Sequence, residues 1–411
     1  MKKISIFAMI LAVIILLSGG GYFVWKNFRG SAPAFQKPAQ NITDFLPTTI
    51  QTASNNSPSP AAPTNTTNST GLPLTLPAGF SISIFAKNLP DARVMIFDKL
   101  GNMWVSRPSA GVVTQLEIQN GVVMNQSDVL TGLNHPHGLA LDPDAAATLY
   151  IGEENQISKI PLYTEATKQK IVDLPAGGEH TTRSLLFGPD GRLYVSIGSS
   201  CNACVENDAR RAAISSLNKD GSNFQPFATG LRNAVFMAVD PKTNEIWATD
   251  MGRDFLGDNL PPDTIDIIRE GKNYGWPYCY GKQVHDSNFD PAGAKIDFCK
   301  TTEPSFIDIQ AHSAPLGLDF LQGSQFPADY QNDLLVAYHG SWNRSVPTGY
   351  KIVRFKFDAS GNYLGSEDFA TGWLAGNSQA LGRPVGIVTG PDGKIYVSDD
   401  KAGVIYQISH S

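Results

Sequence analysis

The sequence has few charged residues and no excess of positive charge. Charged residues make up 17% of its 411 residues, and the formal net charge is −6. Without a basic excess, the chain lacks the electrostatic signature of a nucleic-acid-binding protein. Long stretches of helical periodicity are also scarce, whereas glycine (38) and proline (27) are frequent. This composition favours a turn-rich, all-β protein large enough for one or two domains.

Cysteine is rare as well, and the four cysteines are Cys201, Cys204, Cys279 and Cys299. The segment "CNACV" lacks the histidine of a CxxCH haem-attachment motif, so no covalent haem is expected. The spacings do not match a zinc ribbon either. In an exported chain, four cysteines are expected to form disulfides, in one of three connectivities. We favour the two local pairs, Cys201–Cys204 and Cys279–Cys299.

The N-terminus carries the one long apolar run, which extends from Ile4 to about Trp25 after two lysines. A helix of about 20 apolar residues can span a bilayer. The length and the aromatic residues at the end of the run favour an uncleaved anchor over a signal peptide cut near Gly19–Gly21. Lys2 and Lys3 should remain cytoplasmic, so we expect a membrane-anchored protein with an extracytoplasmic body.

Composition divides the chain into three parts. Residues 1–30 form the anchor or signal segment. Residues 31–73 contain "SPSPAAPTNTTNSTG", a Ser/Thr/Asn/Pro-rich stretch without periodicity, which predicts a disordered linker. Residues 74–411 form the body.

The body repeats one phrase, a tight turn followed by an alternating strand. The copies are "FDKLGNMWVS", "LDPDAAATLYIG", "FGPDGRLYVSIG", "VDPKTNEIWATD", the weaker "FPADYQNDLLVAY" and "TGPDGKIYVSDD". Their starts, at residues 97, 141, 187, 239, 326 and 389, are 44, 46, 52, 87 and 63 residues apart. The shorter intervals match a four-stranded propeller blade, and the longer ones indicate inserted loops. Six copies predict a six-bladed β-propeller, which a strand near Phe80–Phe85 would close. The alternative is an irregular β-sandwich with coincidental turns.

Several polar residues precede the repeated strands, where the loops of a propeller converge at one end of its channel. His180 follows Glu179 and is a candidate general base held by a carboxylate; the alternative is a loop histidine bonded to backbone. Arg232 and Asn233 precede one repeat. Arg383 precedes another, and His135 and His137 a third. Cations repeated at one end of a ring suggest an anionic ligand. For any one arginine alone a solvated turn is the favoured interpretation, and the repeated position argues against it for the set.

The segment "ATDMGRDFLGDNLPPDTIDIIREG" is rich in aspartate. Carboxylates together with backbone carbonyls are ligands that calcium prefers. The spacing is not that of an EF-hand, so a calcium site here rests on composition alone.

Five phrases together resemble the PQQ-dependent glucose/sorbosone and aldose sugar dehydrogenases, which are six-bladed propellers. These phrases are "EHTTRSLLFGPDGRLYVSIGSSCNACVENDARRAAI", "TGLRNAVFMAVDP", "GKNYGWPYCYG", "HGSWNRSVPTGY" and "GRPVGIVTGPDG". The resemblance covers about residues 74–408. It implies that PQQ, a planar tricarboxylate quinone, lies over the channel mouth with a bound calcium.

The resemblance also implies roles for individual residues. His180 corresponds to the base that takes the sugar hydroxyl proton, and Glu179 lies where the family often has an aspartate. Arg232 corresponds to the arginine that polarises the accepting carbonyl of the quinone, beside Asn233. Arg383 corresponds to an arginine that binds a cofactor carboxylate.

Other positions follow the family less closely. The carbonyls of Gly252 and Arg253 correspond to calcium ligands. A cofactor-binding lysine of the soluble glucose dehydrogenase has no counterpart, and Arg344 is its candidate replacement. His137 is a further candidate for binding the cofactor.

The expected activity is therefore oxidation of an aldose or related sugar at its C1 hydroxyl or aldehyde. Hydride would pass to PQQ, and electrons would then pass to an external acceptor, a quinone or a cytochrome. Two alternatives remain open at this point: a calcium-dependent lactonase on a six-bladed propeller, and a non-catalytic exported propeller that binds sugars or proteins.

Overall fold

The computed structural model describes residues 67–410, except residues 146, 324 and 377. The expected membrane anchor, residues 1–30, and most of the expected linker lie outside these described residues. Within the described part of the chain, no helix combines the length and the apolar composition that crossing a bilayer requires.

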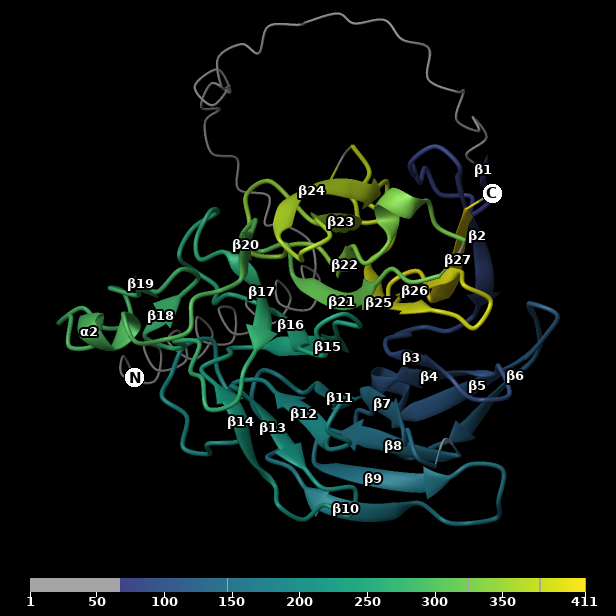
Figure 1. Cartoon of the computed structure of the whole chain (residues 1–411), viewed down its shortest axis with the longest axis horizontal. Helices are drawn as coiled ribbons and strands as arrows, with labels where there is room; N and C mark the ends of the chain where they lie inside the picture. The colour runs from purple at the N-terminus through teal and green to yellow at the C-terminus, as the bar shows by residue number, and fades with distance from the viewer. Residues whose placement is uncertain (1–66, 146, 324, 377, 411) are drawn as a thin grey trace, which may run out of the picture.

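Among the described residues, six sheets of four or five strands, antiparallel apart from the pair of β1 (Thr67–Asn68) and β2 (Phe80–Lys87), are arranged around one axis (Figure 1), and a two-stranded hairpin lies outside this ring of sheets. The innermost strands of all six sheets line a common central channel. The six-bladed propeller predicted from the six repeats is therefore confirmed, and the sandwich alternative is excluded.

The first three blades follow the chain in simple order, from the innermost strand outwards. Blade 1 contains β3 (Met95–Phe97), β4 (Met103–Arg107), β5 (Val112–Gln119) and β6 (Val122–Leu130). Blade 2 contains β7 (Gly138–Leu141), β8 (Thr148–Glu153), β9 (Gln156–Pro161) and β10 (Gln169–Asp173). Blade 3 contains β11 (Arg183–Phe187), β12 (Leu193–Ile197), β13 (Ala213–Leu217) and β14 (Gln225–Thr229).

The last three blades carry the insertions and the closure of the ring. Blade 4 contains β15 (Ala234–Val239), β16 (Ile246–Asp250), β17 (Asp263–Ile268) and β20 (Ile307–Ile309). Blade 5 contains β21 (Pro315–Phe320), β22 (Leu334–Tyr338), β23 (Lys351–Phe357) and β24 (Tyr363–Ala370). Blade 6 contains β25 (Pro384–Thr389), β26 (Ile395–Asp399), β27 (Val404–His410), β2 (Phe80–Lys87) and β1 (Thr67–Asn68).

The long interval between the fourth and fifth repeats is an excursion between β17 and β20. It contains the hairpin of β18 (Cys279–Tyr280) and β19 (Val284–His285), and the short helix α2 (Ile296–Cys299). A disulfide joins Cys279 to Cys299 across this excursion, with the two Cα atoms 5.7 Å apart. Two 3-10 helices, Pro108–Ala110 and Ala328–Tyr330, complete the regular structure of the described residues.

The ring closes through a strand from the beginning of the domain. β2 pairs antiparallel with β27, from Phe80 opposite His410 to Lys87 opposite Val404, and Figure 1 shows these two strands side by side. The prediction that a strand near Phe80–Phe85 completes the last blade is confirmed. The closure gives the outer edge of β27 a partner, since β26 already pairs with its inner edge, so β27 is not an open sheet edge.

The folded domain begins earlier than the composition suggested. Residues 67–73 were expected to belong to the disordered linker, but β1 pairs with β2, Thr67 opposite Ser81. The Asn68 side chain donates hydrogen bonds to the carbonyls of Leu72 and Leu74. A polar composition can therefore still give fixed structure where side chains satisfy a turn.

Hydrophobic clusters fill the space between neighbouring blades. Each of the six blade interfaces has its own cluster, because alternate side chains of every strand point to opposite faces of its sheet. Blades 5 and 6 share a cluster in which Phe80 contacts the rings of Tyr330 and Phe369 at centroid distances of 5.1 and 5.0 Å. The closing strand is thus held by packing as well as by its hydrogen bonds.

Closure should therefore depend on the buried face of β2. Phe80 is 1% exposed, whereas Ile84 on the same strand is 41% exposed. We expect Phe80→Ala to lower the free energy of unfolding by about 3–5 kcal/mol, and the control Ile84→Ala to change it by about 0.5 kcal/mol or less. Chemical denaturation measures both. Equal effects of the two substitutions would contradict the assignment of β2 as the closing strand.

Candidate active site

The hairpin geometry of every blade brings two kinds of loop to one end of the channel, called here the mouth. The start of each innermost strand is paired with the end of the second strand, as in Ala234 opposite Asp250 and Arg183 opposite Ile197. Residues just before an innermost strand therefore lie beside residues just after a second strand. Those before an innermost strand include Arg93, His137, His180, Arg232, Asn233, His312 and Arg383; those after a second strand include Glu154, Ser199, Gly252, His339 and Asp400.

His180 is fixed by the loop that follows β12. Its Nδ1 lies 2.8 Å from the carbonyl oxygen of Ser199 and 3.0 Å from the hydroxyl of the same residue. Because a carbonyl can only accept, Nδ1 carries the proton and the Nε2 lone pair is left for another partner. Burial, together with the positive charge of Arg232, lowers the pKa of His180 to about 3. The imidazole is therefore neutral near neutral pH and able to accept a proton at Nε2.

Glu179 does not hold His180 as the sequence suggested. The Glu179 side chain is exposed, and its backbone N–H donates to the carbonyl of Ser200. The orienting group of His180 is the backbone and hydroxyl of Ser199 instead.

Gly198 allows His180 and Asn233 to approach each other. A Cβ at this position would lie 2.5 Å from Asn233 Oδ1 and 2.7 Å from His180 Cβ. Any larger residue would thus displace one of the two side chains. The structure brings together these two predicted residues, which come from different blades.

Arg232 is held by the loops that follow β12 and β16. Its Nε and Nη2 donate to the carbonyl and to the side-chain oxygen of Asn202, at 3.0 and 2.9 Å. Nη1 donates to the carbonyl of Gly252 at 3.1 Å, and Nη2 lies 3.2 Å from the Asp254 carboxylate. The guanidinium of Arg232 is therefore a fixed positive charge at the mouth.

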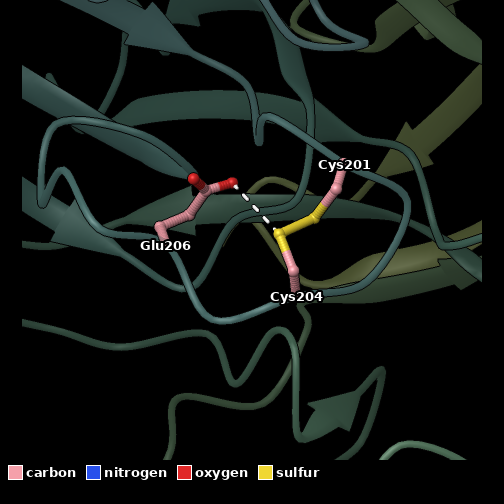
Figure 2. A group of neighbouring side chains, drawn as sticks. All are labelled: Cys201, Cys204 and Glu206. Atoms are coloured by element: carbon pink, nitrogen blue, oxygen red, sulfur yellow. Dashed lines mark hydrogen bonds between the residues drawn. A yellow bond between two sulfur atoms is a disulfide. The ribbon is translucent and has the colours of Figure 1, made fainter.

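Asn202 lies inside the CxxC segment, which gives that motif a structural role. Cys201 and Cys204 form a disulfide with Cα atoms 6.2 Å apart, so both predicted cysteine pairs are confirmed. Figure 2 shows the pair beside Glu206. The same loop supplies Ser199 to His180 and Asn202 to Arg232. The disulfide thus braces the loop that orients both residues.

Arg383 belongs to a network that spans blades 5, 6 and 1. Its Nη1 donates to His339 Nδ1 at 3.2 Å, and Nη2 donates to the Tyr350 hydroxyl at 3.1 Å. Asp400 accepts from His339 Nε2 at 3.0 Å and from Arg93 at 2.8 Å. His339 and two arginines lower the pKa of Asp400 to about 2 despite its burial. The carboxylate is therefore charged and neutralises one of the two arginines.

Two buried arginines at the mouth have no carboxylate partner. Arg183 donates to the carbonyls of His180, Thr182 and Pro175, and within the described residues it forms no ion pair. Arg211 donates to the carbonyls of Pro175, Ala176 and Gly177, again without an ion pair there. Burial and the neighbouring Arg211 lower the pKa of Arg183 to about 10, although Glu154 offsets part of the Arg183 charge through space. Buried charge without a contact partner is costly, so these arginines favour an anion at the mouth.

The two other predicted histidines lie in different surroundings. His137 is 1% exposed, its Nδ1 lies 3.2 Å from the Ser184 hydroxyl, and its Nε2 has no partner among the described residues. Burial and then Arg93 lower the pKa of His137 well below its usual value. His135 is more exposed and lies 3.1 Å from Glu154. Of the two, His137 is thus the one buried beside the channel.

Arg344 connects two loops at the mouth. It donates to the carbonyl of Asp258 and to the side chain of Asn259. Its guanidinium ties the loop after β22 to the loop after β16. In the structure, Arg344 therefore links two loops, whereas the sequence suggested it only as a cofactor-binding residue.

The aspartates at the end of β16 and the start of β17 accept hydrogen bonds from backbone N–H groups. Asp250 accepts from the backbone of Arg232 at 3.0 Å and of Asn233 at 2.6 Å, and Asp263 accepts from Gly252 at 2.9 Å. Burial raises the pKa of both aspartates to about 7. These carboxylates shape the loop and do not gather into a metal cage.

The side chains at the mouth are consequently less suited to binding calcium than to binding an anion. Within the described residues, the one group of three potential ligand side chains within 4.8 Å of each other is Cys201, Cys204 and Glu206 (Figure 2), and both sulfurs are in the disulfide. Arg253 forms an ion pair with Asp286 at 2.9 Å. The Gly252 carbonyl already accepts from Arg232. A calcium ion here would depend on backbone carbonyls and on the ligand itself.

The fit to a polycarboxylate such as PQQ is good. Besides the unpaired charges of Arg183 and Arg211, Arg93 Nε and Asn233 Oδ1 are buried without a hydrogen-bond partner among the described residues. A buried unsatisfied polar group costs about 1–3 kcal/mol. A bound ligand that both donates and accepts would remove this cost.

Comparison with known proteins agrees with this geometry. The sequence model of the TrAA12-like family matches residues 74–411. The chain belongs to the TrAA12-like family. It is thus a PQQ-dependent sugar dehydrogenase-like propeller, as the resemblance of its motifs indicated.

Among sequence relatives of this TrAA12-like chain, an uncharacterized protein of Borreliella burgdorferi is 32% identical over 358 residues, covering 82% of this chain and 90% of the relative. The pyrroloquinoline quinone-dependent pyranose dehydrogenase of Coprinopsis cinerea is 25% identical, covering 80% of this chain. The chain spans 54% of the length of that enzyme.

Two solved structures share the fold. The holo form of the pyranose dehydrogenase PQQ domain from Coprinopsis cinerea superimposes with a TM-score of 0.71 at 21% identity, covering 84% of this chain and all of that one. A structure described as the calcium structure of the Trichoderma reesei family AA12 enzyme gives 0.70 at 22% identity, with the same two coverages.

Sequence reasoning missed Arg93, Arg183, Arg211 and His339. The sequence pattern does identify Arg93 as a candidate site residue, because it precedes the innermost strand of blade 1 just as Arg232 and Arg383 precede the innermost strands of their blades. His339 follows a second strand, so the shared position before the innermost strands gave no signal for it. The burial of Arg183 and Arg211 could not be deduced from sequence, since both stand among polar residues.

The state of His180 can be tested without any cofactor. We expect ¹⁵N NMR of the ring to show the neutral Nδ1–H tautomer from pH 8 down to about pH 4, because the pKa is lowered to about 3. An ordinary histidine would gain its proton near pH 6.5. A titration of His180 with a midpoint near 6.5, or the Nε2–H tautomer, would contradict the arrangement with Ser199.

Proposed function

We propose that the protein oxidises an aldose or related sugar at its C1 hydroxyl or aldehyde, with PQQ and calcium as cofactors. Electrons then pass to an external acceptor, a quinone or a cytochrome. The observation that carries this proposal is the neutral His180, with Nε2 free, beside Asn233 and Arg232 in a mouth that holds uncompensated arginines.

In this proposal, the residues of the mouth have different roles in the reaction. PQQ, when bound, accepts the hydride equivalent that leaves the sugar carbon. His180 takes the hydroxyl proton at Nε2, while Ser199 keeps the ring in the productive tautomer. Arg232 presents a fixed charge to the developing negative charge of the quinone. Positive charge for the cofactor carboxylates would come from Arg93, Arg183, Arg211 and Arg383. Arg344 would contribute indirectly, by holding together the two loops that it joins.

Calcium would be held by the carbonyls of Gly252 and Arg253 together with the cofactor. For Gly252 this requires one carbonyl to serve both Arg232 and the metal, which two lone pairs allow. Asn233 and His137 would contact the cofactor, and the exposed side chain of Glu179 would lie at the edge of the cofactor site.

Reconstitution tests the proposal. The purified full-length chain with PQQ and calcium should reduce an artificial dye when an aldose is supplied. Hydrolysis of a lactone without dye reduction would instead indicate a lactonase. Sugar binding without turnover would indicate a binding protein. Either result would overturn the proposed activity.

Two substitutions should separate the roles at the mouth. His180→Ala should lower turnover by roughly 10²–10⁴-fold, the usual value of a positioned general base, and should leave PQQ affinity nearly unchanged. Arg232→Ala should weaken both turnover and PQQ binding. Steady-state kinetics with a PQQ titration measures both variants. Near-normal turnover of His180→Ala at saturating PQQ would refute the mechanism and make His135 or His137 the next candidate.

We also propose that residues 1–30 anchor the chain in the membrane and that the propeller is extracytoplasmic. The support is the apolar run after Lys2 and Lys3, together with two disulfides, which persist in oxidising compartments. In intact cells, external protease should digest the propeller while the chain remains in the membrane fraction. Protection from protease, or four alkylatable thiols in protein isolated under denaturing conditions, would contradict this topology.

A further inference from the structure

Two loops at the mouth expose aromatic rings that the preceding mechanism does not use. Phe255 lies in the loop between β16 and β17 and is 68% exposed; Trp342 lies in the loop between β22 and β23 and is 47% exposed. Their rings contact each other edge to face, with centroids 5.7 Å apart. Phe255 and Trp342, called here the aromatic pair, thus come from two neighbouring blades.

The backbone holds this pair outwards at a cost. Phe255 has a φ of 70°, in the left-handed region that bulky residues avoid. Such a conformation costs about 1–3 kcal/mol and persists where neighbouring contacts enforce it. The fold itself gains little from a phenyl ring that is mostly in water. A strained, exposed ring is therefore better explained by a ligand than by stability.

Hydrogen bonds on both sides of the pair enforce its position. The backbone N–H of Asp254 donates to the Asn202 side chain at 2.8 Å. The backbone N–H of Ser345 donates to Asp258 at 3.0 Å, and Arg344 ties the same two loops. The aromatic pair is consequently anchored to both neighbouring blades.

Polar side chains connect the pair directly to the reactive residues. Asp254, next to Phe255, lies 3.2 Å from Arg232. Asn343, next to Trp342, donates to Asp254 at 3.4 Å. An apolar ring surface bordered by a carboxylate and an amide is suited to a sugar ring, whose C–H face is apolar and whose edge carries hydroxyls.

We propose that the aromatic pair is a saccharide subsite that stacks the apolar face of a pyranose ring, with Asp254 and Asn343 as partners for its hydroxyls. This inference rests on the proposed sugar oxidation and assigns residues of this chain to the sugar ring, because a flat apolar C–H face is a property of pyranoses rather than of small open-chain alcohols. Subsite residues would hold the sugar, whereas His180 and Arg232 act on its reacting end.

Matched variants test the subsite. Phe255→Ala and Trp342→Ala should each weaken the binding of D-glucose and maltose to the PQQ-free full-length chain by roughly tenfold, measured by isothermal titration. Trp342→Phe should restore most of the affinity, because it keeps an aromatic face. Val346→Ala is the control: Val346 is 69% exposed on the same loop and has no ring. Its affinity should match that of the parent chain.

The outcomes separate the subsite from the activity. The holoenzyme alanine variants should show a raised KM for glucose and an unchanged KM for a small dye. The subsite is refuted if they bind sugar as the parent does, if Val346→Ala loses as much affinity, or if the parent chain binds neither sugar. Any of these results together with intact sugar-to-dye activity would refute the subsite alone and leave the oxidation standing. A changed KM for cytochrome c as acceptor, with an unchanged KM for glucose, would show a protein contact instead and would also refute it.

Discussion

The pairing of β2 with β27 is the constraint on which the rest of the molecule depends. It joins the first strand of the propeller to the last and turns a row of sheets into a ring. The mouth exists only because that ring is closed: blade 1 supplies Arg93, blade 6 supplies Asp400, and the 2.8 Å ion pair between them crosses the closure point. Loss of the closing strand would therefore separate residues of the site as well as hydrophobic surfaces.

The mouth contains buried positive charge that the fold itself does not require. Arg183 is fully buried, and Arg211 and Arg232 are nearly so, yet only Arg232 has a carboxylate within ion-pair distance among the described residues. Backbone carbonyls accept from Arg183 Nη1 and Nη2 and from Arg211 Nη2 without cancelling the charge, while Arg183 Nε and Arg211 Nη1 have no hydrogen-bond partner among the described residues. Such a charged mouth is complementary to a polyanionic ligand. Burial first, and then the positive charge of Arg232, keeps His180 neutral.

One loop carries much of the orientation at this site. The segment from Ser199 to Cys204 provides the acceptor that fixes the tautomer of His180 and the two acceptors that fix Arg232, and Asn202 continues to the backbone of Asp254. A short disulfide-closed loop loses little further entropy when it makes these contacts. The same chain of contacts leads on to the aromatic pair, so the proposed proton acceptor and the proposed sugar subsite share one scaffold.

The sequence by itself determined the repeat, the number of blades, the closing strand and both cysteine pairs, because turn residues and alternating hydrophobicity are local signals. It also brought forward His180, Arg232, Asn233 and Arg383, since their common position before an innermost strand follows from the repeat. Tertiary structure decided the rest. That Ser199 rather than Glu179 orients His180, that Arg344 ties two loops, and that Arg183 and Arg211 lie buried without counter-ions all depend on contacts between segments far apart in the chain. Hydrogen-bond partners and burial depend on how six blades pack around one axis. A local pattern of residues cannot predict these contacts, because they join segments that are far apart in the chain.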